Sequence, residues 1–129
     1  MFENAEIVSK YTNEDAIRDG VFLDVNTLTP SKGIAKEAGY KYPVYVTSNL
    51  FTTWIESEDE ANGQSTEGRL WDVLYMSVRT GKDEGNMRTF QVRFAQGRRQ
   101  RVVTLWAVCE PFSDSDPKPI VKIMLPADY

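Results

Sequence analysis

The chain has 129 residues, a formal net charge of −4, a single cysteine and no histidine. These features exclude an internal disulfide, a Ser-His-Asp triad, a Cys-His pair and a zinc site with histidine ligands. A mildly acidic chain also lacks the basic surface that broad, non-specific DNA binding needs. Apolar residues make up 41% of the chain and charged residues 26%, so we expect one ordinary globular domain over residues 1–129.

The expected compartment follows from three further features. No stretch reaches the roughly 18 apolar residues of a membrane span. The first residues lack the basic region and following apolar stretch of a signal peptide, and Cys109 is the only thiol. We therefore expect a cytoplasmic protein that folds without a metal or another cofactor.

The N-terminal half predicts short elements separated by glycine and proline. In chain order they are a strand over residues 6–12, a helical turn over 14–19, a strand over 21–25, a short helix between Pro30 and Gly39, an extended segment over 40–47 and a helix over 49–57. Residues 56–63 are rich in acidic side chains. This segment indicates an exposed linker, with an acidic contact site as the alternative.

Residues 66–81 predict the central helix of the fold. Thr66 is a suitable N-cap, and Gly81 is a suitable left-handed stop. One broad face is apolar and is expected to lie across a sheet; it carries Leu70, Trp71, Leu74 and Val78. Trp71 is expected in the core, because its side chain alone can bury about 200 Å².

The C-terminal third changes from helical to alternating periodicity, which predicts strands. Residues 90–95 and 101–110 alternate on either side of a turn at 96–100, which is the pattern of a β-hairpin. A loop at 111–119 precedes a last strand at 120–125. Helices first and strands last predict an α+β fold, with an antiparallel sheet built mainly from the C-terminal third and packed by short helices.

Four arginines are concentrated at or near the predicted hairpin turn, namely Arg93, Arg98, Arg99 and Arg101. They form the only basic concentration in this acidic chain. Guanidinium groups can hold phosphates or a carboxylate-rich partner. In the alternative, which the sequence alone favours, the arginines keep a turn soluble and shield an edge strand.

Tyr42 and Tyr45, together with Tyr40, surround Pro43 and form a second candidate binding surface. Tyrosine rings can stack on a nucleic-acid base. The alternative, again favoured by the sequence alone, is aromatic packing of an extended segment on the helices.

Two reactive side chains have plain structural interpretations. Asp72 lies between core positions of the predicted central helix, where it can pair with Arg69, reach Arg93 as a buried polar group, or act as a general base. Cys109 lies among apolar strand residues, which predicts a packed and inert thiol. Because no second catalytic group is visible near Asp72, we predict that the protein is not an enzyme.

Five pieces spread over most of the chain carry a family resemblance. They are residues 15–21, 38–44, 68–74, 103–109 without position 106, and 123–126. In this order they resemble a family of small proteins carried by plasmids, phages and integrative elements, which is a domain of unknown function. Residues 114–119 depart from it, because relatives usually carry a Gly-Asp-rich loop there. The resemblance implies an accessory protein of mobile DNA and supplies no catalytic residue.

Two hypotheses about function follow. In the first, which rests on the resemblance, a non-catalytic accessory protein of a mobile element or phage binds a host or element protein, for instance to counter host defence. In the second, the chain binds a small nucleotide or single-stranded nucleic acid through the arginine-rich hairpin tip and the tyrosines. We expect a protein partner and no membrane, and the sequence leaves the oligomeric state open.

Overall fold

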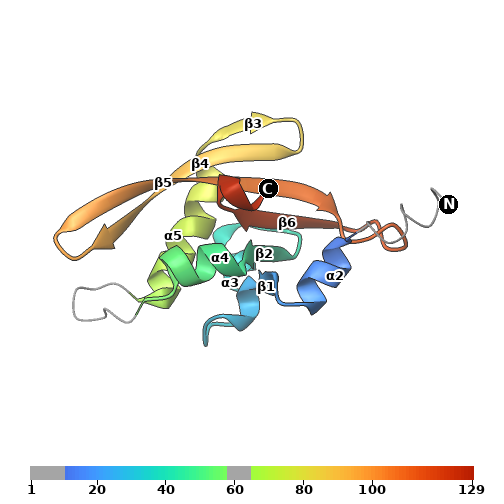
Figure 1. Cartoon of the computed structure of the whole chain (residues 1–129), viewed down its shortest axis with the longest axis horizontal. Coiled ribbons are helices and arrows are strands. Elements are labelled where there is room, and N and C mark those ends of the chain that lie inside the picture. Colours follow the sequence, from blue (N-terminus) through green and yellow to red (C-terminus); the bar gives the residue numbers. More distant parts are fainter. Residues whose placement is uncertain (1–10, 58–64) are drawn as a thin grey trace.

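The computed structural model describes residues 11–57 and 65–129, which form an α+β fold (Figure 1). The described strands make a six-stranded sheet in the order β1-β2-β6-β5-β4-β3. Their bounds are β1 (Phe22–Asp24), β2 (Val44–Thr47), β3 (Lys82–Glu84), β4 (Met87–Gln96), β5 (Arg99–Pro111) and β6 (Pro119–Met124). Residues 6–10 of the predicted strand and residues 58–63 of the acidic linker lie outside the described residues. Tyr11 and Thr12, the last two residues of that predicted strand, belong to no strand, and Thr12 instead caps the helix that begins at Asn13.

The sheet is mostly antiparallel, as predicted, and most of its strand residues come from the C-terminal part of the chain. The exception to the antiparallel order is the pair β2 and β6, which run parallel, with Val44 opposite Val121. Through this pairing, β1 and β2 from the N-terminal half join the sheet formed by the C-terminal strands. Alternation within each strand cannot predict which distant strand it pairs with.

The described helices are short, apart from α5. Their bounds are α2 (Asn13–Arg18), the 3₁₀ turn η1 (Val25–Thr27), α3 (Ile34–Ala38), α4 (Ser48–Leu50), the π-helical turn η2 (Phe51–Ile55), α5 (Thr66–Arg79) and the 3₁₀ turn η4 (Pro126–Asp128). Figure 1 shows α3, α4 and α5 on one face of the sheet, which we call the inner face. No helix in the described part of the chain is both long and apolar enough to cross a membrane.

Helix α5 begins one residue earlier than predicted. The N-cap is Ser65, whose hydroxyl accepts a 2.9 Å hydrogen bond from the Gly68 amide, while the Thr66 hydroxyl instead bonds to the backbone of Ser57. Gly81, two residues beyond the helix, has a φ of +101°, as its role as a left-handed stop requires. A Cβ there would lie 2.5 Å from the Thr89 carbonyl oxygen, so only glycine fits.

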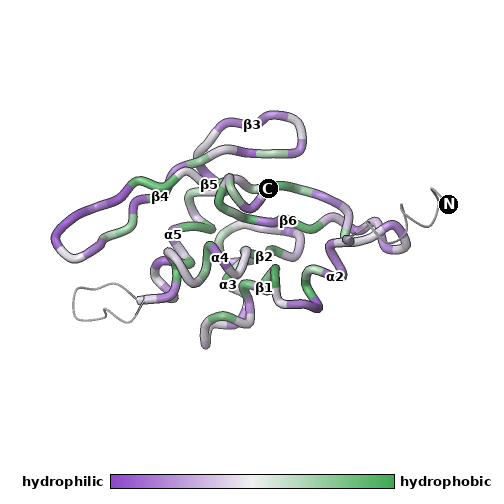
Figure 2. Tube along the Cα trace, in the orientation of Figure 1, coloured by the Kyte–Doolittle hydropathy of each residue, from purple (hydrophilic) through white to green (hydrophobic). Residues whose placement is uncertain are grey.

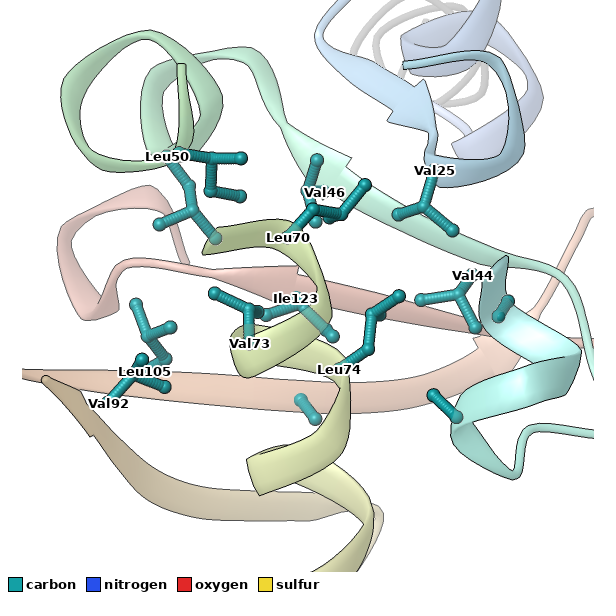
Figure 3. Packing of buried hydrophobic residues seen from close by; sticks show 14 of the residues in the cluster. Val25, Val44, Val46, Leu50, Leu70, Val73, Leu74, Val92, Leu105 and Ile123 are labelled. Atoms are coloured by element: carbon teal, nitrogen blue, oxygen red, sulfur yellow. The ribbon is translucent and has the colours of Figure 1, made fainter. Parts of the chain in front are cut away.

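The core lies between α5 and the inner face of the sheet (Figure 3). Leu70, Val73 and Leu74 are fully buried. Trp71, predicted to be a core residue, is only half-buried and packs on the edge of the cluster. At about 100° per residue, it falls on the flank of the helix rather than at the centre of the buried face.

The opposite face holds a smaller buried group around Lys122, which is only 8% exposed. Its Nζ donates a 2.9 Å hydrogen bond to Asn13 Oδ1, lies 3.1 Å from Glu110 Oε1 and lies 4.9 Å from the Phe22 ring centroid. A buried ammonium needs such partners, because its lost hydration is otherwise uncompensated. Lys122 therefore connects α2 to β5 and β6.

Candidate functional site

Strands β4 and β5 extend beyond their neighbours. Strand β3 pairs only with residues 87–89 of β4, and β6 pairs only with residues 106–111 of β5. Residues 90–105, which we call the hairpin arm, therefore form a two-stranded projection (Figure 1). Gly97 has a φ of +59° in the two-residue turn, which is the positive angle that a tight hairpin turn requires at its first position.

All four predicted arginines lie on the hairpin arm and are exposed. Figure 2 shows the end of the arm as strongly hydrophilic. The arginines do not share one face. Arg101 is opposite Phe94 and Arg99 is opposite Gln96, on the side of the inner face, whereas Arg93 is opposite Val102 on the other side. Arg98 occupies the turn itself.

The four guanidinium groups have no partner in the part of the chain that the structure describes. Within residues 11–57 and 65–129, none of Arg93, Arg98, Arg99 and Arg101 takes part in an ion pair or a side-chain hydrogen bond. The tip (residues 97–101) therefore presents charge that the described part of the protein does not neutralise.

Arg69 holds the arm close to its tip, because it contacts Phe94 and Ala95, which lie just before the turn. The sequence does not reveal this role. Its Nη1 donates to the Trp54 carbonyl at 2.7 Å, and its Nη2 donates to the Ala95 carbonyl at 2.6 Å. The guanidinium lies 5.7 Å from the centroid of the Phe94 ring, which stacks on Trp54 at 5.4 Å. These contacts fix the direction of the arm relative to α5.

Asp72 is exposed, so the interpretation as a buried polar group is wrong. At about 100° per residue, Asp72 lies on the other side of α5 from Leu70 and Leu74, which are buried. Together with Tyr75 and Arg93, Asp72 lines an open groove of about 450 Å³ between α5 and β4. Partial burial beside this groove raises the pKa of Asp72.

The tyrosines lie at the other end of β5 from the arginines. Tyr42 is 49% exposed and Tyr45 is half-buried, so packing on the helices is wrong for Tyr42. Both line a groove of about 400 Å³ beside Phe112. The twelve residue steps of β5 from Arg99 to Pro111 span about 40 Å, so the tip and the tyrosines do not form one site.

Tyr40 fits the packing interpretation. Its side chain packs against the core, and its hydroxyl lies 2.6 Å from Ser77 Oγ, which itself donates to the Leu74 carbonyl at 2.7 Å. Since the Ser77 proton is used there, the Tyr40 hydroxyl donates to Ser77. Burial raises the pKa of Tyr40.

An open cleft of about 430 Å³ lies where α5 ends, between Tyr40 and the turn that joins β3 to β4. Arg88 lies in this cleft and caps the C-terminal end of α5, because its Nη1 donates hydrogen bonds to the Ser77 and Val78 carbonyls at 2.9 and 3.0 Å. The same guanidinium forms a bidentate hydrogen-bonded pair with the Asp83 carboxylate at 2.5 and 3.0 Å. The hydrogen bond from Arg88 lowers the pKa of the Asp83 carboxyl.

Cys109 also lines this cleft and is exposed, so the prediction of a packed thiol is wrong. Alternation places it on the inner face, in register with Val121, as the sequence indicates. The helix that covers this face ends at Arg79, however, and leaves the cleft open over Cys109. Among the described residues, no group of three or more acidic, cysteine or histidine side chains is placed to hold a metal ion.

Comparison with known proteins gives one result. A family of unknown function, DUF6573, matches over residues 1–129, which is the whole chain. No curated protein and no solved structure matches the chain significantly. Because the match covers every residue, the chain belongs to the family of unknown function DUF6573.

Proposed function

We propose that this protein is a non-catalytic binding protein that contacts an acidic protein surface with the tip of its hairpin arm. One observation carries the proposal. Arg98, Arg99 and Arg101 are exposed at the end of a projecting arm and have no ion-pair partner among the described residues. Exposed guanidinium groups form charge-assisted and often bidentate hydrogen bonds with carboxylates.

The construction of the arm supports a role in contact. Arg69 and the stacked Trp54 and Phe94 rings hold the arm at residues 94 and 95, just before the tip, so the tip loses little conformational freedom when a partner binds. Arg93 lies on the face opposite Arg99 and Arg101. An arm with charge on both faces suits a concave acidic surface that receives it from two sides.

The biological setting is inferred from the resemblance. The protein serves a mobile genetic element or phage in the host cytoplasm, where it binds a host or element protein, such as a component of host defence. What supports this setting is the order of the similar pieces along the chain. The proposal does not depend on a catalytic residue.

Single-stranded nucleic acid is the second candidate for the tip, because arginines also bind phosphates. One observation weighs against it. The tyrosine rings that would stack on bases lie about 40 Å from the tip along β5.

A binding experiment with two polyanions tests the proposal. Fluorescent polyglutamate represents an acidic protein surface, and an oligothymidylate of equal charge represents single-stranded DNA. The variant R98A/R99A is compared with K32A/K36A, which removes the same charge from exposed positions around α3. We expect R98A/R99A to weaken polyglutamate binding about tenfold and to make its salt dependence shallower.

The control K32A/K36A should bind polyglutamate like the parent, and both variants should keep the parent melting temperature within a few degrees. If both double variants bound polyglutamate equally weakly, the effect would be one of net charge, which would refute a role for the tip. If the parent bound the oligothymidylate more tightly than polyglutamate, and only R98A/R99A lost that binding, the tip would be assigned to nucleic acid instead.

A further inference from the structure

We propose a second binding site, separate from the tip, that takes a mononucleotide in the groove between the start of β2 and the loop at residues 112–118. We call it the tyrosine groove and define it by Tyr42, Tyr45, Phe112, Lys41, Lys118 and Asp116. Its volume of about 400 Å³ lies within the usual range for small-molecule sites. This inference does not depend on the function proposed for the tip.

The parallel pairing of β2 and β6 builds one wall of the groove. The Val121 amide donates a 2.9 Å hydrogen bond to the Pro43 carbonyl, and Pro119 stands opposite Pro111 at the end of β5. Proline has no amide hydrogen to continue a ladder, so regular pairing stops at this corner. The side chains of Tyr42 and Tyr45 are thereby placed beside the end of the sheet.

The loop at 112–118 forms the other wall and is held by its own hydrogen bonds. The Phe112 amide donates to the Lys118 carbonyl at 2.9 Å, and the Ser113 amide donates to the Asp116 carbonyl at 2.9 Å. The Asp116 amide in turn donates to Ser113 Oγ at 2.9 Å. Phe112 and Lys118 therefore hold fixed positions before any ligand arrives, which lowers the cost of binding.

The aromatic rings of the groove are available for stacking. Within the described residues, Tyr42, Tyr45 and Phe112 make no ring contact with another aromatic side chain or with a cation. Tyr42 leaves 49% of its surface in solvent. Exposed rings of this kind bind flat, weakly hydrated rings such as nucleobases, because stacking removes apolar surface from water on both partners.

The charges of the groove select an anion. Lys41 and Lys118 are exposed, and neither forms an ion pair with a described residue. Asp116 is the single carboxylate of the lining, and one of its oxygens accepts the Lys118 amide at 3.3 Å. Two ammonium groups against one carboxylate leave a positive excess in an acidic protein. A phosphate fits the lysines, and the remaining carboxylate oxygen can accept hydrogen bonds from sugar hydroxyls.

The rings, the lysines and the carboxylate together match a base, a phosphate and a sugar. A neutral aromatic compound would leave the lysines unused, and inorganic phosphate would leave the rings unused. The volume suits one nucleotide rather than a strand. The geometry therefore points to a nucleoside monophosphate as the occupant.

NMR titration of the ¹⁵N-labelled full chain with nucleoside 5′-monophosphates tests this site. We expect amide shifts at residues 41–45 and 112–120 and none at the tip. Tyr42→Ala should weaken binding about tenfold and Tyr42→Phe should restore it, because stacking needs the ring and not the hydroxyl. Lys118→Ala should weaken binding about threefold, whereas Lys36→Ala, an exposed lysine on α3, should bind like the parent.

Two further probes separate the contribution of the base from that of the phosphate. The nucleoside without phosphate and inorganic phosphate alone should each bind more weakly than the monophosphate. The spectrum of each variant also shows whether it is folded. The proposal fails if millimolar nucleotide causes no shifts, if the shifts map to the tip, or if folded Tyr42→Ala binds as tightly as the parent. An absence of shifts, or unchanged binding by Tyr42→Ala, would leave the function proposed for the tip unaffected.

Discussion

Arg69 Nη2 donates a 2.6 Å hydrogen bond to the carbonyl oxygen of Ala95, which connects the first turn of α5 to the last residues of β4. With the 2.7 Å bond from Nη1 to the Trp54 carbonyl, this side chain joins three segments that are far apart in sequence. It fixes where the hairpin arm points, and so where the arginines of the tip are presented.

Arg69→Ala is expected to reduce the free energy of unfolding by about 3 kcal/mol, because two carbonyls that accept from a charged donor lose it. Chemical denaturation should show a lower midpoint with an unchanged slope. Arg18→Ala is the matched control, since Arg18 pairs with Asp15 on the surface, and it should change stability by less than about 0.5 kcal/mol. Equal effects of the two substitutions would refute the role of Arg69.

Leu74→Ala should be more damaging than Trp71→Ala, although tryptophan is the larger side chain. Leu74 is fully buried, so its loss leaves a cavity and costs about 3 kcal/mol. Trp71 is half-buried, so its removal should cost about 2 kcal/mol. Thermal melts of the two variants compare them directly, and a lower melting temperature for Trp71→Ala would contradict the packing described above.

Gly81→Ala should destabilise the protein by at least about 2 kcal/mol, because the new Cβ would lie 2.5 Å from the Thr89 carbonyl oxygen at a φ of +101°. Gly85→Ala is the control. Its φ is also positive, at +62°, but no atom lies within 4 Å of the added Cβ. It should therefore show the smaller, purely conformational cost of about 1 kcal/mol. Equal melting temperatures would show that the backbone relaxes at Gly81.

The pair of Asp83 and Arg88 should make stability depend on acid pH. Because the hydrogen bond from Arg88 lowers the folded-state pKa of Asp83, the pair stabilises the fold above the unfolded pKa of about 4. This stability is lost as the pH falls through the folded pKa. Asp83→Asn should therefore melt below the parent at pH 6, and the difference should shrink at pH 3. A difference that is constant with pH would exclude this linkage.

Removal of metals and reduction of thiols should leave the melting temperature unchanged. The chain has no histidine and one cysteine, and we expect folding to depend on neither a metal nor a disulfide. Melts with and without a chelator and a reductant give the answer. A clear drop with the chelator alone would reveal a carboxylate site that the sequence does not show, and a drop with the reductant alone would reveal a disulfide between chains.

Local patterns determined the elements whose residues interact with near neighbours in sequence. Alternation in residues 90–110 predicted the hairpin, and the structure pairs Phe90 with Leu105 and Val92 with Val103 on one face. Gly81 was recognisable because a left-handed position rarely admits another residue. The family resemblance was also visible in the sequence, and the match to DUF6573 confirms it as a family of unknown function.

The candidate sites depend on contacts that no local pattern contains. Four arginines close together in sequence lie on two faces of the arm, because side chains alternate and the turn occupies only two residues. The tyrosines lie far from them along the whole length of β5. Their groove exists because β2 pairs in parallel with β6, a contact between positions 44 and 121.

The sequence by itself determined the α+β class, the hairpin, the boundaries of the central helix to within a residue or two, and the basic character of the tip. Only the tertiary structure decided which side chains are covered. Cys109 follows the predicted alternation, yet it lies beyond the end of the helix that covers its face. Periodicity fixes the direction of a side chain from its own backbone, whereas burial depends on which distant segment packs above it.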